Sequence, residues 1–300
     1  MKRESFGSRL GFILVSAGCA IGIGNVWKFP YICGAYGGAA FILIYLCFLV
    51  ILGIPVLVAE FAVGRGSHTS VAKCFDKLAP AGSGWKPLKF IGIIGCYMLM
   101  MFYTTVGGWM IYYCVKSLRG DFVGATPEAV TQSFSDMLGN APTMMLWMVI
   151  ICLIGFAVCF MGLQNGIEKI SKVMMSALLI IMVILAVHSV MMEGAGEGIR
   201  FYLIPDFQKI KEAGVGNVVF AALSQSFFTL SIGIGAMLIF GSYLDKSRSL
   251  TGEAVSITVL DTFVALTAGF IIIPACFSYG IQPDAGPSLI FITLPNILQR

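Results

Sequence analysis

Two short segments of the chain combine glycine-rich backbone with oxygen-bearing side chains, and together they could bind a small cation. Ile-Gly-Ile-Gly occurs at residues 21–24 and again at 232–235. Hard cations take several oxygen ligands, and carbonyls of non-helical backbone can supply some of them. The side chains that could supply the others are those of Asn25, Thr229, Ser231 and Asp261.

The first glycine-rich segment is expected to interrupt a helix. Glycines at 18, 22 and 24 each lower helix propensity by up to about 1 kcal/mol relative to alanine. Non-helical backbone at membrane depth is tolerated where it lines a cavity or binds a ligand, although small residues also let helices pack closely. The second copy favours the broken helix, because paired glycine-interrupted segments are typical of secondary-transporter sites. Both copies are followed five positions later by a phenylalanine, Phe29 and Phe240.

A pair of broken helices offers opposite charges at one place. The half-helix that begins at a break directs its positive end and free amides towards an anion, and the half that ends there presents carbonyls to a cation. If a substrate carboxylate completes the cation's ligand set, each ligand strengthens the binding of the other. This arrangement predicts coupled binding of an ion and a solute.

Three ionisable residues lie inside or at the edge of apolar stretches, where each costs about 2.5–3.5 kcal/mol near the membrane centre. Asp261 is interpreted as a cation ligand, or else as a protonated acid bonded to a neighbouring helix. Glu60 is expected to accept hydrogen bonds from the amides of an opened helix. Lys28 follows the first break and either closes a gate by pairing with an acid or extends its amine to the membrane surface.

The composition identifies the solvent of these segments as a lipid bilayer. Of the 300 residues, 58% are hydrophobic and 11% charged, with a mean hydropathy of +0.92, far from the roughly 25% charge of soluble domains. A formal net charge of +4 gives no reason to expect nucleic-acid binding. The nine cysteines form no CxxC pair, and His68 and His188 stand far apart, so a transition-metal site is not expected.

Seven apolar stretches are long enough to cross about 30 Å of hydrocarbon. They cover residues 10–33, 39–63, 88–114, 144–162, 170–192, 217–241 and 255–281. Between the second and third stretches we expect an interfacial helix near 68–78. The connection 119–142 contains three acidic residues and two prolines, and is expected to be a solvated loop.

Lysine and arginine predict the orientation of these spans. They are more numerous in the segments 1–9, 64–89, 163–172 and 242–253 than in 115–143 and 193–216. The positive-inside rule then places the N-terminus in the cytoplasm. We therefore expect a cytoplasmic segment 1–9 and a membrane domain at 10–283, with helices 1–5 over about 10–192 and helices 6 and 7 over about 217–283. An outer loop would begin at 284–300.

Several longer motifs in the chain resemble those of a known family. They are RLG at 9–11, GCAIGIGNVWKFP at 18–30, YGGAAF at 36–41, GIP at 53–55, EFAVGR at 60–65 and QSFFTLSIGIG at 225–235. They resemble the bacterial neurotransmitter:sodium symporters of the LeuT type. The resemblance implies an all-α polytopic membrane protein with helices 1 and 6 broken, and this chain would cover about seven of twelve helices.

The resemblance implies two sodium sites and one amino-acid site, with no organic cofactor. One sodium would use the Ala20 carbonyl, Asn25, Thr229, Asp261 and the substrate carboxylate. The second would use the carbonyls of Gly18 and Ile21 together with an eighth helix. The residues around the amino acid would be Ala20, Gly22, Gly24, Leu99, Tyr103, Phe228, Ser231, Gly233 and Ile234. Gating or supporting roles would fall to Arg3, Lys28, Tyr45, Glu60 and Gln225.

Two residues depart from the family's commonest pattern. Asp261 replaces a frequent asparagine beside Tyr45, Gln225 and Thr229, the positions that surround chloride in chloride-dependent members. A fixed carboxylate there could replace chloride, so we expect chloride-independent transport. Lys28 replaces a usual arginine and lacks its planar fork. The chain also stops in a segment resembling the outer loop after helix 7, as expected of an incomplete or truncated chain.

The function expected from the sequence is sodium-coupled import of an amino acid across the bacterial inner membrane. Ile234 between Gly233 and Gly235 leaves room for a bulky apolar or aromatic side chain. A passive channel, an amino-acid-binding receptor and an inactive fragment remain alternatives. An intramembrane enzyme is disfavoured, because the sequence places no nucleophile pair or carboxylate dyad at membrane depth.

Overall fold

The computed structural model describes residues 6–280 and Phe291, and all regular secondary structure in that part of the chain is helical. The first half contains α1 (Arg9–Ala20), the π-helix η1 (Gly24–Lys28), α2 (Phe29–Ala35), α3 (Ala39–Phe48), the π-helix η2 (Leu49–Gly53), α4 (Ile54–Ser67), α5 (Val71–Leu78), α6 (Leu88–Arg119) and α7 (Pro127–Gly139). The second half contains α8 (Ala141–Phe160), the π-helix η3 (Leu163–Glu168), α9 (Lys169–Val190), α10 (Ala195–Leu203), α11 (Phe207–Ala213), α12 (Val215–Thr229), α13 (Ala236–Gly241) and α14 (Leu250–Tyr279).

Among the residues that the structure describes, five continuous helices are long and apolar enough to cross a membrane: Ala39–Ser67, Leu88–Arg119, Ala141–Phe160, Leu163–Val190 and Leu250–Tyr279. A sixth candidate is the broken pair Arg9–Ala20 and Gly24–Ala35, in which the chain bends by 54° between the two helices. The seventh predicted span, 217–241, is different. It forms α12, which is too short to cross alone, and the separate helix α13.

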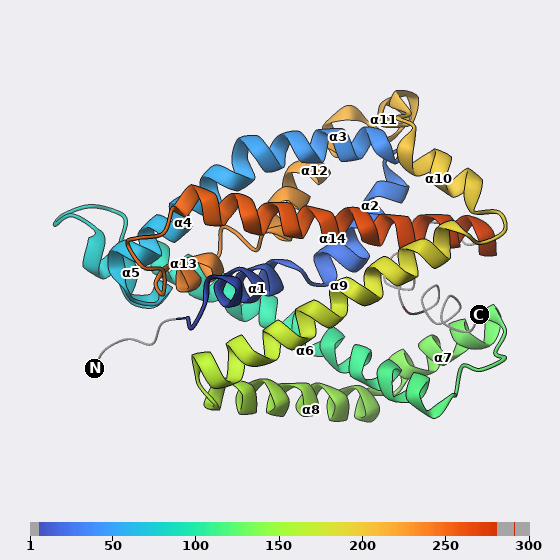
Figure 1. The fold of residues 1–300 in the computed structure, drawn as a ribbon, viewed down its shortest axis with the longest axis horizontal. Helices are drawn as coiled ribbons and strands as arrows, with labels where there is room; N and C mark the ends of the chain where they lie inside the picture. The colour runs from blue at the N-terminus through green and yellow to red at the C-terminus, as the bar shows by residue number, and fades with distance from the viewer. Residues whose placement is uncertain (1–5, 281–290, 292–300) are drawn as a thin grey trace.

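Helix α14 lies at the centre of the bundle (Figure 1). It packs against α1, α4, α9 and α10. Two side chains from neighbouring helices donate hydrogen bonds to its main chain: Ser189 Oγ to the Ile271 carbonyl at 2.6 Å, and Tyr202 hydroxyl to the Leu266 carbonyl at 2.9 Å. Because these donors hold α14 in place, Asp261 on this helix has a fixed position in the core.

Residues 119–142 are more ordered than the solvated loop expected from the sequence. They contain α7, whose Val130, Phe134 and Met137 are buried against the aromatic rings of Tyr113 and Phe122. These three residues follow the i, i+4, i+7 spacing of one helix face. The acidic residues and prolines suggested a loop, but this short apolar face was sufficient for a helix to pack on the bundle.

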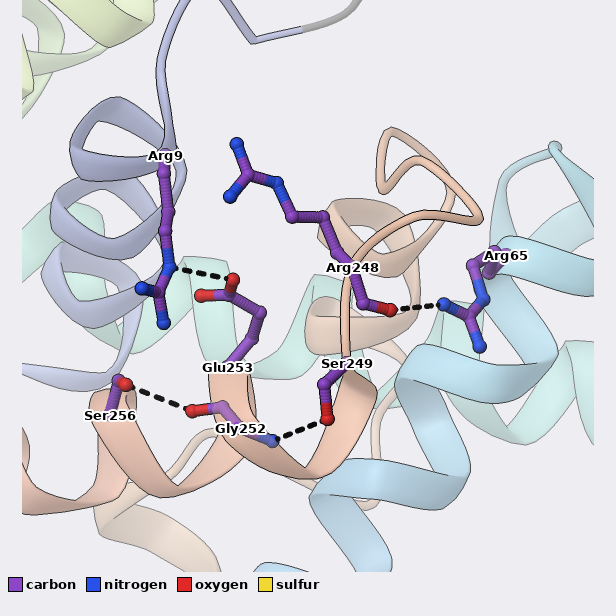
Figure 2. Close-up of polar contacts among 7 residues, drawn as sticks. All are labelled: Arg9, Arg65, Arg248, Ser249, Gly252, Glu253 and Ser256. Atoms are coloured by element: carbon purple, nitrogen blue, oxygen red, sulfur yellow. Dashed lines mark hydrogen bonds and ion pairs between the residues drawn. The ribbon is translucent and has the colours of Figure 1, made fainter.

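The start of α1 is tied to two other parts of the fold. The Gly7 amide donates to Glu168 Oε2 at 2.8 Å, and Lys172 Nζ lies 2.6 Å from the other oxygen of that carboxylate. Arg9 Nε contacts Glu253 Oε1 at 2.9 Å, joining α1 to the first turn of α14 (Figure 2). The N-terminal end of α1 is therefore held by charged contacts to both η3 and α14.

Removing Arg9 is expected to destabilise the fold more than neutralising its partner. The Glu253 side chain is 3% exposed and that of Arg9 is 52% exposed. Arg9→Ala leaves a buried carboxylate without its cation, at a cost of about 1–3 kcal/mol after allowance for solvent screening of the arginine. Glu253→Gln removes the buried charge itself and should cost less. Thermal unfolding in detergent measures both, and equal or reversed effects would contradict this assignment.

Candidate ion and substrate site

The first break separates α1 from η1 at residues 21–23. Ile21 has extended backbone, with φ −72° and ψ 106°, so the α-helical bonding ends at Ala20. A local hydrogen bond spans the break, because the Gly22 amide donates to Asn25 Oδ1 at 3.3 Å. The break therefore places Asn25 in the core, where it is fully buried.

The second break covers residues 230–235, between α12 and α13. Ser231, Gly233 and Gly235 all have left-handed backbone, with φ of 52°, 92° and 76°. Left-handed backbone is costly for a serine, and here the Ser231 hydroxyl donates to the Cys19 carbonyl near the end of α1 at 3.0 Å. Leu230 is fully buried next to Gly53 of η2. The second break thus contacts the end of α1, next to the first break.

Three of the predicted cation ligands meet between the breaks. Asn25 Nδ2 donates to Asp261 Oδ1 at 2.7 Å and to Thr229 Oγ1 at 3.2 Å, and Thr229 Oγ1 donates to Asp261 Oδ2 at 2.8 Å. All three residues are completely buried. Their amide, hydroxyl and carboxylate oxygens are the hard donors that suit a hard cation. An ion would bind there by replacing some of these mutual hydrogen bonds.

Glu60 of α4 accepts hydrogen bonds from amides that the second break leaves free. The Gly233 amide donates to its Oε1 at 2.6 Å, and the Leu238 amide in the first turn of α13 donates to Oε2 at 3.2 Å. A carboxylate at a helix N-terminus is also favoured by the helix dipole. Close packing of α13 on α4 makes this reach possible: a Cβ atom on Gly241 would lie 2.6 Å from Phe61 Cα.

A cavity of about 470 Å³ lies beside the breaks, within the range typical of small-molecule sites. Its walls come from α6, α12 and the second break: Gly95, Met98, Leu99, Phe102, Tyr103, Ser224, Phe227, Phe228, Ser231, Ile232 and Ile234. Five of the expected substrate residues are among them. Gly95 and Phe102 were not predicted from the sequence, although helical spacing from Leu99 and Tyr103 could have indicated both.

Two glycines at the first break, Gly22 and Gly24, lie against residues that line this cavity. Gly22 lies beside Tyr103, since a Cβ atom there would be 3.8 Å from Tyr103 Cε1. Gly24 lies against the Phe228 ring, where a Cβ atom would be 2.9 Å from two ring carbons. Any larger residue at 24 would push into the ring that lines the cavity.

The expected gating and support residues have different surroundings. Lys28 Nζ lies 3.9 Å from the centre of the Phe228 ring, and in the described part of the chain no ion pair joins it to an acid. Gln225 Nε2 donates to the Gly24 carbonyl at 3.0 Å, and Tyr45 is fully buried against the Phe29 ring. Arg3 lies outside the described residues, as do 281–283 at the end of the expected membrane domain and 284–300 apart from Phe291.

Comparison with known proteins identifies the family. The model of the sodium:neurotransmitter symporter family matches residues 3–129 and 128–300. The chain belongs to this family. It is 36% identical over 299 residues to the uncharacterised sodium-dependent transporter YhdH of Bacillus subtilis. That match covers the whole chain and 65% of YhdH.

A solved member of this symporter family confirms the LeuT-type fold. The crystal structure of MhsT in complex with L-phenylalanine matches with a TM-score of 0.92 and 38% identity, over 99% of this chain and 67% of that one. A more distant relative is the sodium- and chloride-dependent taurine transporter of Rattus norvegicus, 26% identical over 98% of this chain and 54% of the transporter. The chain thus spans about two thirds of the length of YhdH and of MhsT.

Proposed function

We propose that this symporter imports an amino acid with a large apolar or aromatic side chain, driven by the sodium gradient. The observation that carries the proposal is the meeting of Asn25, Thr229 and Asp261 between two broken helices, directly beside an apolar cavity. The orientation follows the positive-inside rule, with the N-terminus in the cytoplasm.

One sodium ion would bind the Ala20 carbonyl and the oxygens of Asn25, Thr229 and Asp261, together with the substrate carboxylate. A second would use the carbonyls of Gly18 and Ile21. Amides of Gly22 and Gly24 and the Tyr103 hydroxyl would receive the substrate carboxylate, since amides at an interrupted helix favour anions.

The ammonium group would meet carbonyls at Ala20, Phe228 and Ser231. The apolar side chain would then lie among Leu99, Phe228 and Ile234 in the cavity. Because the substrate carboxylate is itself a sodium ligand in this arrangement, sodium and amino acid would each raise the affinity of the other.

Uptake into proteoliposomes tests this function. The purified full chain would be reconstituted, and radiolabelled amino acids offered with an inward sodium gradient or with sodium equal on both sides. We expect accumulation above the external concentration with the gradient alone. A channel would equilibrate the solute, and a receptor would bind it without uptake. Competition by unlabelled amino acids then identifies the preferred side chain.

Transport is expected to be independent of chloride. Asp261 places a fixed carboxylate 2.8 Å from Thr229 Oγ1, so the negative charge that balances sodium is already part of the protein. Replacing chloride with gluconate should leave wild-type uptake unchanged. Asp261→Asn removes that charge while keeping the side-chain size, and its residual uptake should rise at least about tenfold with chloride. Chloride-stimulated uptake by the wild type would refute this assignment.

A further inference from the structure

Ile234 lines the cavity, and its main chain is held by contacts on two sides. On one side, the preceding amide, that of Gly233, donates to Glu60 Oε1 at 2.6 Å. On the other, Cys96 Sγ on α6 lies 3.4 Å from the Ile234 carbonyl oxygen, to which it donates. Because both contacts hold the backbone, the Ile234 side chain cannot move away simply by shifting the loop.

The Ile234 side chain rests on a glycine. A Cβ atom at Gly95 would lie 3.0 Å from Ile234 Cγ2 and 3.7 Å from Ile234 Cβ. The first distance is shorter than ordinary van der Waals contact. Both residues line the cavity. The missing side chain at 95 is therefore the space into which Ile234 retracts.

We propose that Gly95 determines which amino acids this symporter accepts, by setting the depth of the cavity. With glycine at 95, Ile234 lies low and the cavity takes a large apolar or aromatic side chain. A methyl group at 95 would occupy part of that space and push Ile234 towards the substrate. This inference rests on the proposed amino-acid transport. It adds Gly95 as a specificity residue that acts by setting the position of the Ile234 side chain.

The test compares transport of a large and a small substrate. Uptake efficiency of tryptophan and alanine would be measured in proteoliposomes with the full chain, and expressed as a ratio. One methyl-sized change in an apolar pocket alters such ratios by about 10–200-fold. We therefore expect the tryptophan-to-alanine ratio to fall at least about tenfold in Gly95→Ala.

Two further variants separate a specificity role from a folding defect. Gly107→Ala is the matched control, because Gly107 is on the same helix but faces α8, where a Cβ atom would lie 3.3 Å from Ile151 Cγ1. Its ratio should equal that of the wild type. Ile234→Ala removes the side chain that Gly95 accommodates. In that background, Gly95→Ala should change the ratio by less than about twofold, because contacting residues are energetically coupled.

Each outcome decides the inference. If the wild type accumulates amino acids but Gly95→Ala leaves the ratio unchanged, the inference is wrong and the proposed function stands. The inference is also wrong if the ratio falls equally with and without the Ile234 side chain, or if the wild type accepts small substrates alone. A wild type that accumulates no amino acid overturns both.

Discussion

Asp261→Ala is expected to abolish measurable coupling between sodium and substrate, with sodium affinity falling at least about 100-fold. The Asp261 carboxylate is fully buried and accepts from Asn25 at 2.7 Å and from Thr229 at 2.8 Å. Its removal deletes the anionic ligand and leaves two buried donors without this acceptor, each costing about 1–3 kcal/mol. Substrate affinity must fall as well, because the coupling between two ligands is reciprocal.

Binding measurements on the purified protein test this result. Radiolabelled amino acid would be titrated at several sodium concentrations, for the wild type and for Asp261→Ala. Ser256→Ala is the matched control: Ser256 is also on α14, and its hydroxyl donates within the helix, to the Gly252 carbonyl at 2.8 Å. The control should bind as the wild type does. Unchanged sodium affinity in Asp261→Ala would show that the ion binds elsewhere.

Glu60→Ala is expected to lower the stability of the fold substantially. The Glu60 carboxylate accepts from the amides of Gly233 and Leu238. Hydrogen bonds to charged groups contribute about 1.5–3 kcal/mol each, and the carboxylate is only partly buried, so we expect a loss of roughly 2–4 kcal/mol. Transport should also be lost, because the second break would no longer hold its shape.

Thermal unfolding in detergent, followed by uptake in proteoliposomes, checks both effects. Glu60→Gln provides a graded comparison, because its single amide oxygen can accept from one of the two main-chain donors. Its melting temperature should lie between those of the wild type and Glu60→Ala. A melting temperature for Glu60→Ala equal to that of the wild type would mean that these amides are satisfied in another way.

The positions of the two breaks could be predicted because their signals are local. Glycines at membrane depth weaken a helix wherever they occur, and the oxygen-bearing residues Asn25 and Thr229 lie within or beside the same segments. Glu60 was recognisable as an acid in an apolar stretch that needs a partner. Amides of an opened helix were the partner expected from the sequence, and the structure places the amides of Gly233 and Leu238 there.

Other features depend on contacts between distant residues and had no local signal. The π-helical turns η1, η2 and η3 share their composition with ordinary helix. The helix α7 forms because its apolar face covers Tyr113 and Phe122, a fact of tertiary packing. For Gly95, helical spacing could indicate only that it faces the cavity, because its contact with Ile234 joins segments more than a hundred residues apart.

The irregular turn η2 and the second break lie at the same depth of the bundle, since Leu230 packs beside Gly53. On one side of this contact, Glu60 of α4 accepts a hydrogen bond from α13, and on the other side α12 packs on α3. The irregular parts of the two spans are therefore in contact with each other. If α4 and α13 tilt together, the main chain can flex at 49–53 and 230–235, where its hydrogen bonding departs from the α-helical pattern. The two helices would then move as one unit relative to α3 and α12.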